Sequence, residues 1–92
     1  MDTSKIELPN NLIDLIEPLA AHVHECWMQT RAKEGWRYSQ TRDDKEKLSP
    51  LMVPYDQLSE SEKETDRVTV RETLKGMLLL TRFPPNWAKE KG

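Results

Sequence analysis

The sequence predicts a mainly α-helical domain, with two antiparallel helices over about residues 10–34 and 60–81 joined by a long loop with short extended segments. Three observations lead to this class. Apolar residues recur at intervals of three and four along residues 12–30, which is the pattern of an amphipathic helix. The stretch "SESE" at residues 59–62 is a helix-start signal, and a segment bordered by aromatic residues separates the two patterns. A chain of 92 residues suits one domain with a small core.

The first helix is expected to begin at Asn10 or Asn11, because asparagine side chains commonly cap helix N-termini. Gly35 is expected to end it, since a left-handed residue often follows the last turn. Pro18 cannot donate a backbone hydrogen bond to Asp14, so it either kinks the helix or separates a short leading turn, and we expect the kink. The apolar stripe consists of Leu12, Ile13, Leu15, Ile16, Leu19, Ala20, Val23, Trp27 and Thr30.

The second helix is expected to start at Glu60. Ser59 and Glu62 have the spacing of a capping box, and acidic residues in the first turn suit the helix dipole. Arg71 lies in the apolar stripe and is expected to be paired or to extend its charged end into water. The helix is expected to end near residue 81, before Pro84-Pro85. The face predicted to meet the core consists of Val68, Arg71, Leu74, Met77, Leu78 and Thr81.

The connection between the helices is unusually long for a compact domain, unless it is functional or contains short elements of its own. Trp36 and Tyr38 follow the first helix, and Pro54 and Tyr55 precede the second. Large aromatic rings bury much apolar surface, so they are expected to hold the two ends of the loop against the helices. The charged middle, "TRDDKEK" at residues 41–47, is expected to stay in water.

The chain divides into an extended lead-in over residues 1–9, the domain over residues 10–83 and a polar tail over residues 84–92. Trp87 in the tail is expected to fold back onto the helices or to contact another chain. Cys26 is the single cysteine, so an intrachain disulfide is excluded, as is typical of a reducing compartment. The longest apolar run, Met77–Leu80, is far shorter than the roughly 20 residues of a membrane span. We expect a cytoplasmic protein without membrane insertion.

The charge pattern argues against a nucleic-acid-binding surface. The net charge is −2, the sequence pI is about 5.7, and acidic and basic residues are interspersed along the chain. A polyanion is bound by a basic patch, which this sequence does not contain. We therefore expect no nucleic-acid polymer as a partner.

The residues that could do chemistry form no convincing site. His22, His24 and Cys26 suggest metal binding, but only His22 and Cys26 share a side of a helix, and structural zinc takes four ligands. A Cys–His nucleophile would also need an orienting third group and an oxyanion site. Asp43 and Asp44 lie in the charged loop and are expected to form a solvated turn, because general acid–base catalysis needs a desolvated site. We expect no catalytic residue, no metal and no cofactor.

Several motifs in one order resemble the ryanodine receptor repeat domain. The resemblance runs from Leu8 to about Phe83, and His24 and Trp27 have the His-x-x-Trp spacing of that family. In that context His24 is expected to hydrogen-bond a loop carbonyl while the Trp27 indole packs. This chain has Ser49 where the family often has His. The matching stretches are "LP" at 8–9, "LAAHVHECW" at 19–27, "GWRY" at 35–38, "RDD" at 42–44, "LSPLMVPY" at 48–55, "LSESEK" at 58–63 and "ETLKGMLLL" at 72–80.

The resemblance implies a helical module without catalytic residues that acts in interaction and regulation. In the calcium-release channels such repeats lie on the cytosolic surface, and tandem copies pack around an approximate twofold axis. A single copy is expected to recover that arrangement as a homodimer. The resemblance also implies a helix pair that supports the long loop.

Two functional hypotheses remain open. In the first, the chain is an interaction module that self-associates or docks onto a partner protein, with Trp36, Tyr38, Tyr55 and Trp87 as anchors. In the second, it senses a nucleotide-derived anionic ligand through aromatic stacking and basic side chains. Against both stands the interpretation that the aromatic residues anchor the core and the basic residues are solvated. The candidate residues for ligand or partner binding are Trp36, Arg37, Tyr38, Arg42, Lys47 and Tyr55.

Overall fold

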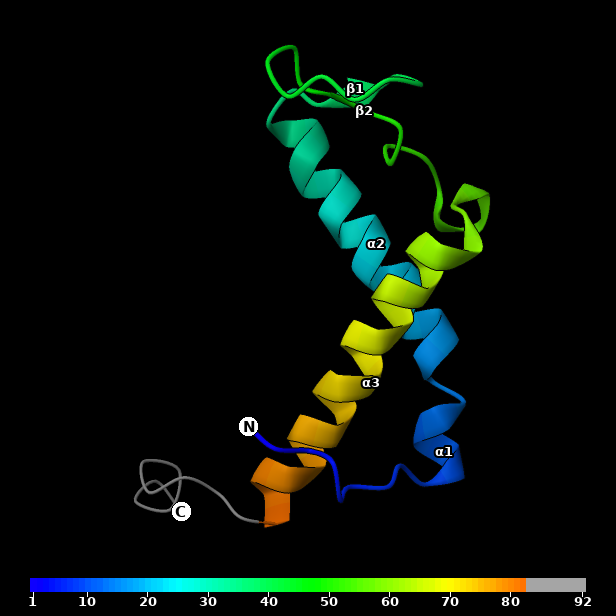
Figure 1. The fold of residues 1–92 in the computed structure, drawn as a ribbon, viewed down its shortest axis with the longest axis vertical. Helices are drawn as coiled ribbons and strands as arrows, with labels where there is room; N and C mark the ends of the chain where they lie inside the picture. The colour runs from blue at the N-terminus through cyan, green and yellow to red at the C-terminus, as the bar shows by residue number, and fades with distance from the viewer. Residues whose placement is uncertain (83–92) are drawn as a thin grey trace.

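Helices account for most of the regular structure, as the sequence predicts. The structure, a computed structural model, describes residues 1–82, so the expectations for Phe83, Trp87 and the tail over residues 84–92 lie outside the described residues. The elements in order are α1 (Asn10–Ile13), α2 (Ile16–Lys33), β1 (Arg37–Tyr38), β2 (Leu48–Ser49), the 3₁₀ helix η1 (Tyr55–Gln57) and α3 (Glu60–Arg82). Figure 1 shows α2 and α3 as the two long helices that cross each other. The mainly helical class is confirmed, and the antiparallel alignment stays a prediction.

The first helix is divided, and the expected kink at Pro18 is wrong. The break falls after Ile13, so α1 is a single leading turn and α2 begins at Ile16. Pro18 is therefore the third residue of α2. The first four N–H groups of a helix have no acceptor within the helix, so a proline there removes no helical hydrogen bond.

The N-terminal cap of α1 differs from the prediction, whereas the C-terminal end of α2 agrees with it. Pro9 is the N-cap of α1 and offers no side-chain cap hydrogen bond, so the expected capping by Asn10 or Asn11 is wrong. At the other end, Gly35 follows α2 with φ 96°, a left-handed conformation that glycine adopts readily. Gly35 therefore ends this helix as predicted.

The start of α3 is confirmed at Glu60. The Ser59 hydroxyl oxygen accepts the Glu62 backbone N–H at 3.3 Å, and the same hydroxyl donates to Glu62 Oε1 at 2.8 Å. One of the unpaired N-terminal donors is thereby satisfied, and the Glu62 side chain is held beside the cap.

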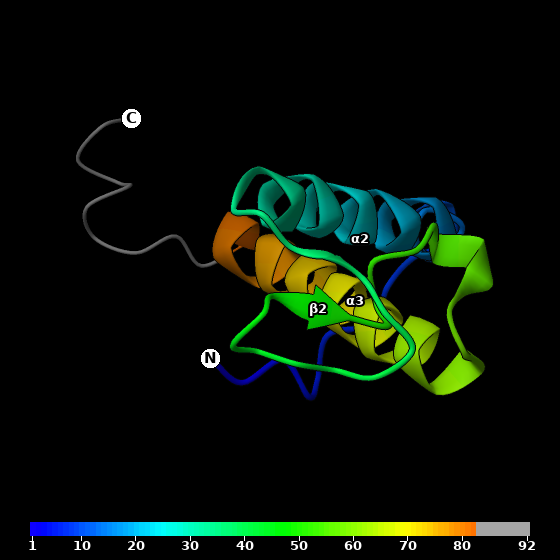
Figure 2. The ribbon, with the colours of Figure 1, turned by 90° about the horizontal axis from the view of Figure 1, so that it is seen from above.

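The core lies where α2 and α3 cross. It consists of Ile16 and Ala20 of α2 with Val70 and Leu74 of α3, and Tyr55 packs at its edge. Ala20 has no exposed surface. Its small side chain lets the two helices approach closely at the crossing, and α3 then covers it. Seen from above in Figure 2, the two helices lie side by side.

The predicted inner face of α3 is partly wrong. Val68 and Met77 are 45% and 49% exposed, whereas Val70 and Leu74 are buried. Val70 and Leu74 are four residues apart and face α2 together, while Val68 lies on the far side of the helix. Met77 falls in the last two turns of α3, which extend away from α2 in Figure 1.

The N-terminal segment packs against α3. Ile6 is buried, and the Thr3 hydroxyl donates a hydrogen bond to Glu72 Oε1 at 2.6 Å. In Figure 1 this segment passes the C-terminal part of α3 before it reaches α1. The boundary at residue 10 stays a prediction.

The long loop contains the expected extended segments. β1 and β2 pair in parallel, with Arg37 opposite Leu48 and Tyr38 opposite Ser49. Asp43 forms an antiparallel bridge to Leu48, so β2 has hydrogen-bonded neighbours on both sides. Ser49 is buried, and its hydroxyl accepts the Leu51 N–H at 3.1 Å. The loop is therefore ordered by strand pairing and hydrogen bonds, and it is not an irregular connection.

Candidate functional site

A buried histidine holds the loop to the helix pair. His24 of α2 is only 5% exposed, and its Nε2 donates to the Val53 carbonyl oxygen at 2.7 Å. The His24 ring stacks on Trp27, with centroids 5.6 Å apart, and lies 6.4 Å from the Tyr55 ring. This confirms the predicted contact of His24 with a loop carbonyl and the packing of the Trp27 indole.

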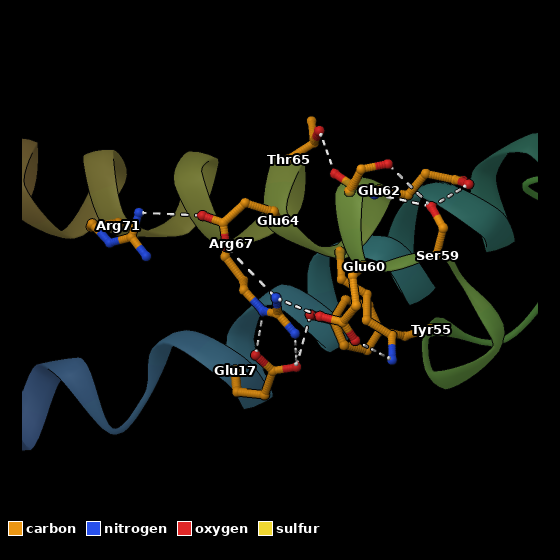
Figure 3. Close-up of polar contacts among 11 residues, drawn as sticks. Glu17, Tyr55, Ser59, Glu60, Glu62, Glu64, Thr65, Arg67 and Arg71 are labelled. Atoms are coloured by element: carbon orange, nitrogen blue, oxygen red, sulfur yellow. Dashed lines mark hydrogen bonds and ion pairs between the residues drawn. The ribbon is translucent and has the colours of Figure 1, made fainter.

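Tyr55 lies in a polar network that joins η1 to both long helices. Its hydroxyl donates to Glu17 Oε1 at 2.9 Å, and Arg67 Nε donates to Glu17 Oε2 at 2.6 Å. Arg67 also donates to Glu60 at 3.2 Å, and Figure 3 shows its guanidinium between the two carboxylates. The pKa of Tyr55 is raised, first by burial and then by Glu17. The network explains why this end of the loop is anchored.

The network predicts a pH dependence of stability. The hydrogen bond from Arg67, and then that from Tyr55, lowers the pKa of Glu17 below its ordinary value. Because the folded pKa is depressed, ionised Glu17 contributes stability above its unfolded pKa of about 4.3, and the contribution is lost as pH falls through the folded pKa. Glu17→Gln is therefore expected to lower the urea midpoint at pH 7 and to match the unmodified chain near pH 2.

The control for this experiment is Glu25→Gln, an exposed carboxylate on the same helix. It is expected to leave the difference between pH 7 and low pH unchanged. A Glu17→Gln midpoint that differs from the unmodified chain by the same amount at every pH would contradict the ionic role of Glu17.

The other candidate residues gather around β1 and β2, away from Tyr55. Trp36 is half-buried, with the Arg31 guanidinium 5.6 Å from the centroid of its ring. Arg37 is exposed, and Tyr38 is 53% exposed. Successive side chains of a strand point to opposite faces, so Arg37 points away from the face shared by Trp36 and Tyr38. The structure therefore does not place Arg37 between the two rings.

Two of the predicted basic residues already have partners within the loop region. Lys47 Nζ donates to the Glu34 carbonyl oxygen at the end of α2, at 2.7 Å. Arg42 Nε donates to Asp44 Oδ1 at 2.7 Å, in an exposed ion pair. An anion bound by this loop would have to draw Lys47 and Arg42 from these contacts.

A comparison with known families decides the relationship suggested by the motifs. The model of the RyR domain family matches residues 1–82. The chain belongs to the RyR domain family. The match covers the core, the loop and the His24–Trp27 pair, so the resemblance drawn from the sequence is confirmed.

This RyR domain has a pocket that the sequence analysis missed. The pocket measures about 470 Å³ and lies between α2, α3 and the loop. The sequence signal that could have indicated it is the pair Glu62 and Asp66, two acidic residues one turn apart next to the buried face of Val70 and Leu74. Its lining residues are Val23, His24, Trp27, Leu51, Leu58, Glu62, Thr65, Asp66 and Thr69.

The remaining side chains of interest in the RyR domain lie apart from this pocket. Cys26 Sγ is 3.5 Å from His22 Nε2, so these two share a side of α2 as expected. Across residues 1–82, no three His, Cys, Asp or Glu side chains come close enough to hold a metal ion.

Over the same range, none of the helices combines the length and the apolarity that a membrane crossing needs.

Proposed function

We propose that this RyR domain is a non-catalytic interaction module of the cytoplasm that self-associates through the loop between its helices. The observation that carries the proposal is the position of Tyr38, a large ring that is 53% exposed on an ordered strand. Tyrosine is enriched at binding hot spots, because it combines a large apolar area with a hydroxyl group. The proposed surface consists of the exposed Tyr38 ring of β1 and the half-buried Trp36 that precedes this strand.

Order in the loop supports this role. The backbone N–H of Arg37 donates to the Lys47 carbonyl at 2.9 Å, and that of Ser39 donates to the Ser49 carbonyl at 3.3 Å. These two hydrogen bonds fix the backbone immediately before and after Tyr38. A ring that is fixed before binding loses little conformational freedom on association.

The environment of the loop carboxylates supports the absence of catalysis. Asp43 Oδ1 accepts the backbone N–H groups of Lys45 and Glu46, at 3.1 and 3.2 Å. Asp44 is held in the exposed pair with Arg42. These carboxylates shape a solvated turn, whereas an acid–base pair would need a desolvated site.

Sedimentation velocity over a range of concentrations tests the proposed self-association. A monomer–dimer equilibrium is expected, and Tyr38→Ala is expected to raise its Kd at least about tenfold, as removal of a hot-spot aromatic does. Arg37→Ala is the matched control, because that side chain points to the opposite face, and it is expected to stay within about twofold. A chain that is monomeric at millimolar concentration, or a dimer unaffected by Tyr38→Ala, would contradict the proposal.

A second candidate function is the sensing of a nucleotide-derived anion. The observation that favours it is Arg37, an exposed basic side chain that forms no ion pair within residues 1–82. Native mass spectrometry with nucleotides and dinucleotides tests this candidate. A stoichiometric adduct that disappears in Arg37→Ala would support a sensor, and an adduct that persists in Arg37→Ala would contradict it.

A further inference from the structure

An apolar groove lies between α2 and α3, separate from the larger pocket under the loop. It measures about 180 Å³, and its accessible surface is apolar. Val23 in its wall is 38% exposed, and Thr69 and Thr73 are exposed as well. This interhelical groove is lined by Leu19 and Val23 of α2 with Thr69, Val70, Thr73 and Leu74 of α3.

The two threonines of the interhelical groove use their hydroxyl groups within α3. Thr69 Oγ1 donates to the Thr65 carbonyl oxygen at 3.1 Å, and Thr73 Oγ1 donates to the Thr69 carbonyl oxygen at 2.7 Å. A hydroxyl bonded to the backbone of its own helix needs no further partner in the groove. The groove therefore suits an apolar group, which gains free energy by leaving water.

The chain itself has a large apolar side chain shortly after this groove. α3 ends at Arg82, and the sequence continues as "FPPNWAKEKG", with Trp87 five positions after Arg82. Proline does not continue a helix, and it disfavours the helical conformation of the residue before it, so the Pro84-Pro85 pair favours an extended path. The place of Trp87 is limited by the length of chain between it and Arg82.

This length selects the interhelical groove over the larger pocket. Thr73 lies nine positions before Arg82, which corresponds to about 14 Å along the helix. The five residues from Arg82 to Trp87 span about 17 Å when extended. Asp66, in the wall of the larger pocket, is sixteen positions before Arg82 and about 24 Å away, beyond this reach. Phe83 follows Arg82 directly and reaches neither.

A segment of the same chain is favoured over a second copy by its tether. A short connection keeps the attached ring at an effective concentration in the millimolar range. The two prolines restrict the connection, so it has less conformational freedom to lose when the ring binds. A tryptophan ring also buries a large apolar area, and its N–H group can stay in water at the open side of the groove.

We propose that the indole ring of Trp87 docks in the interhelical groove of its own chain, so that the segment after α3 folds back along that helix. The ring packs against the side chains of Val23, Thr73 and Leu74 and removes their apolar surface from water. Residues 84–86 bridge the distance from the end of α3. The groove is a different surface from the Tyr38 and Trp36 surface proposed for self-association.

Nuclear Overhauser effects in the ¹³C,¹⁵N-labelled full chain test the proposal. Cross-peaks are expected from the ring protons of Trp87 to the methyl groups of Leu19, Val23 and Leu74. A mixture of labelled and unlabelled chains is expected to show none of these cross-peaks in an isotope-filtered spectrum, because the contact lies within one chain.

Thr73→Glu is the variant that closes the groove to the ring. It places a charged group beside the docked indole, which is unfavourable, while glutamate is at least as good a helix former as threonine. The Trp87 cross-peaks are expected to be lost, and the indole N–H resonance is expected to move to the position of a tryptophan in water. Val68→Glu is the matched control, because Val68 is 45% exposed on the far side of α3, and it is expected to keep the cross-peaks.

Three outcomes would overturn the proposal. They are the absence of Trp87 cross-peaks to the groove in a folded chain, cross-peaks that survive Thr73→Glu, and cross-peaks between labelled and unlabelled chains, which would place the ring in a second copy. Tyr38→Ala is expected to leave the Trp87 cross-peaks unchanged. A failure of the self-association test is thereby distinguished from a failure of this one.

Discussion

Replacement of His24 with alanine is expected to lower the free energy of unfolding by about 2 to 4 kcal/mol. The ring is buried at the junction of α2 and the loop, so its removal leaves a cavity beside Trp27 and Tyr55. It also leaves the Val53 carbonyl without the donor that now lies at 2.7 Å. Urea unfolding of the purified chain, followed by circular dichroism, measures the loss.

Two further variants separate the parts of this effect. His24→Phe keeps a ring against Trp27 but lacks the donor, so it is expected to cost about 1 to 3 kcal/mol through the unpaired Val53 carbonyl. His22→Ala, an exposed histidine on the same helix, is expected to stay within about 0.5 kcal/mol. If His24→Phe were as stable as the unmodified chain, the hydrogen bond to the loop would carry no stability.

Leu74→Ala is expected to be destabilising by about 2 to 4 kcal/mol, because it removes a buried side chain from the contact of α3 with α2. Leu74 is 8% exposed and packs in the same cluster as Ile16, Ala20 and Val70. Collapse around the missing atoms is limited, since residues on two rigid helices form the walls. The midpoint and the slope of urea unfolding give the change in free energy.

Met77→Ala is the matched control for this prediction. Met77 lies on the same helix and in the face that the sequence suggested, but it is 49% exposed. It is expected to cost less than about 1 kcal/mol, because its side chain is only partly removed from water. Equal losses for Leu74→Ala and Met77→Ala would mean that the last two turns of α3 are also covered in solution.

The contrast between Leu74 and Met77 shows where sequence reasoning reached its limit. Apolar periodicity identifies that a segment is an amphipathic helix, but a helix such as α3 has apolar residues at several angles around its axis. Val68 and Val70 differ by two positions and therefore point in nearly opposite directions. Only the position of α2 decides which of these sides is buried.

Some features of the candidate site were predicted from the sequence, and others were not. The contact of His24 with a loop carbonyl was predicted, because the resemblance places His24 and Trp27 beside the loop. The Arg67–Glu17–Tyr55 network and the acidic pocket were not predicted. Glu17 and Arg67 are 50 positions apart in the chain, and no local pattern brings two such residues together. The contacts of Lys47 with the Glu34 carbonyl and of Arg42 with Asp44 were likewise not predicted.

The sequence by itself determined the features that depend on neighbouring residues. These are the helical class, the capping box at Ser59 and Glu62, the end of the first helical segment at Gly35 and the membership in the RyR domain family. Tertiary structure alone decided which face of α3 meets α2, that the first helix is interrupted after Ile13 and not kinked at Pro18, and where the carboxylates of Glu62 and Asp66 lie. The physical reason is range: caps and turns are set by hydrogen bonds between residues a few positions apart, whereas burial and pockets are set by how whole helices cross.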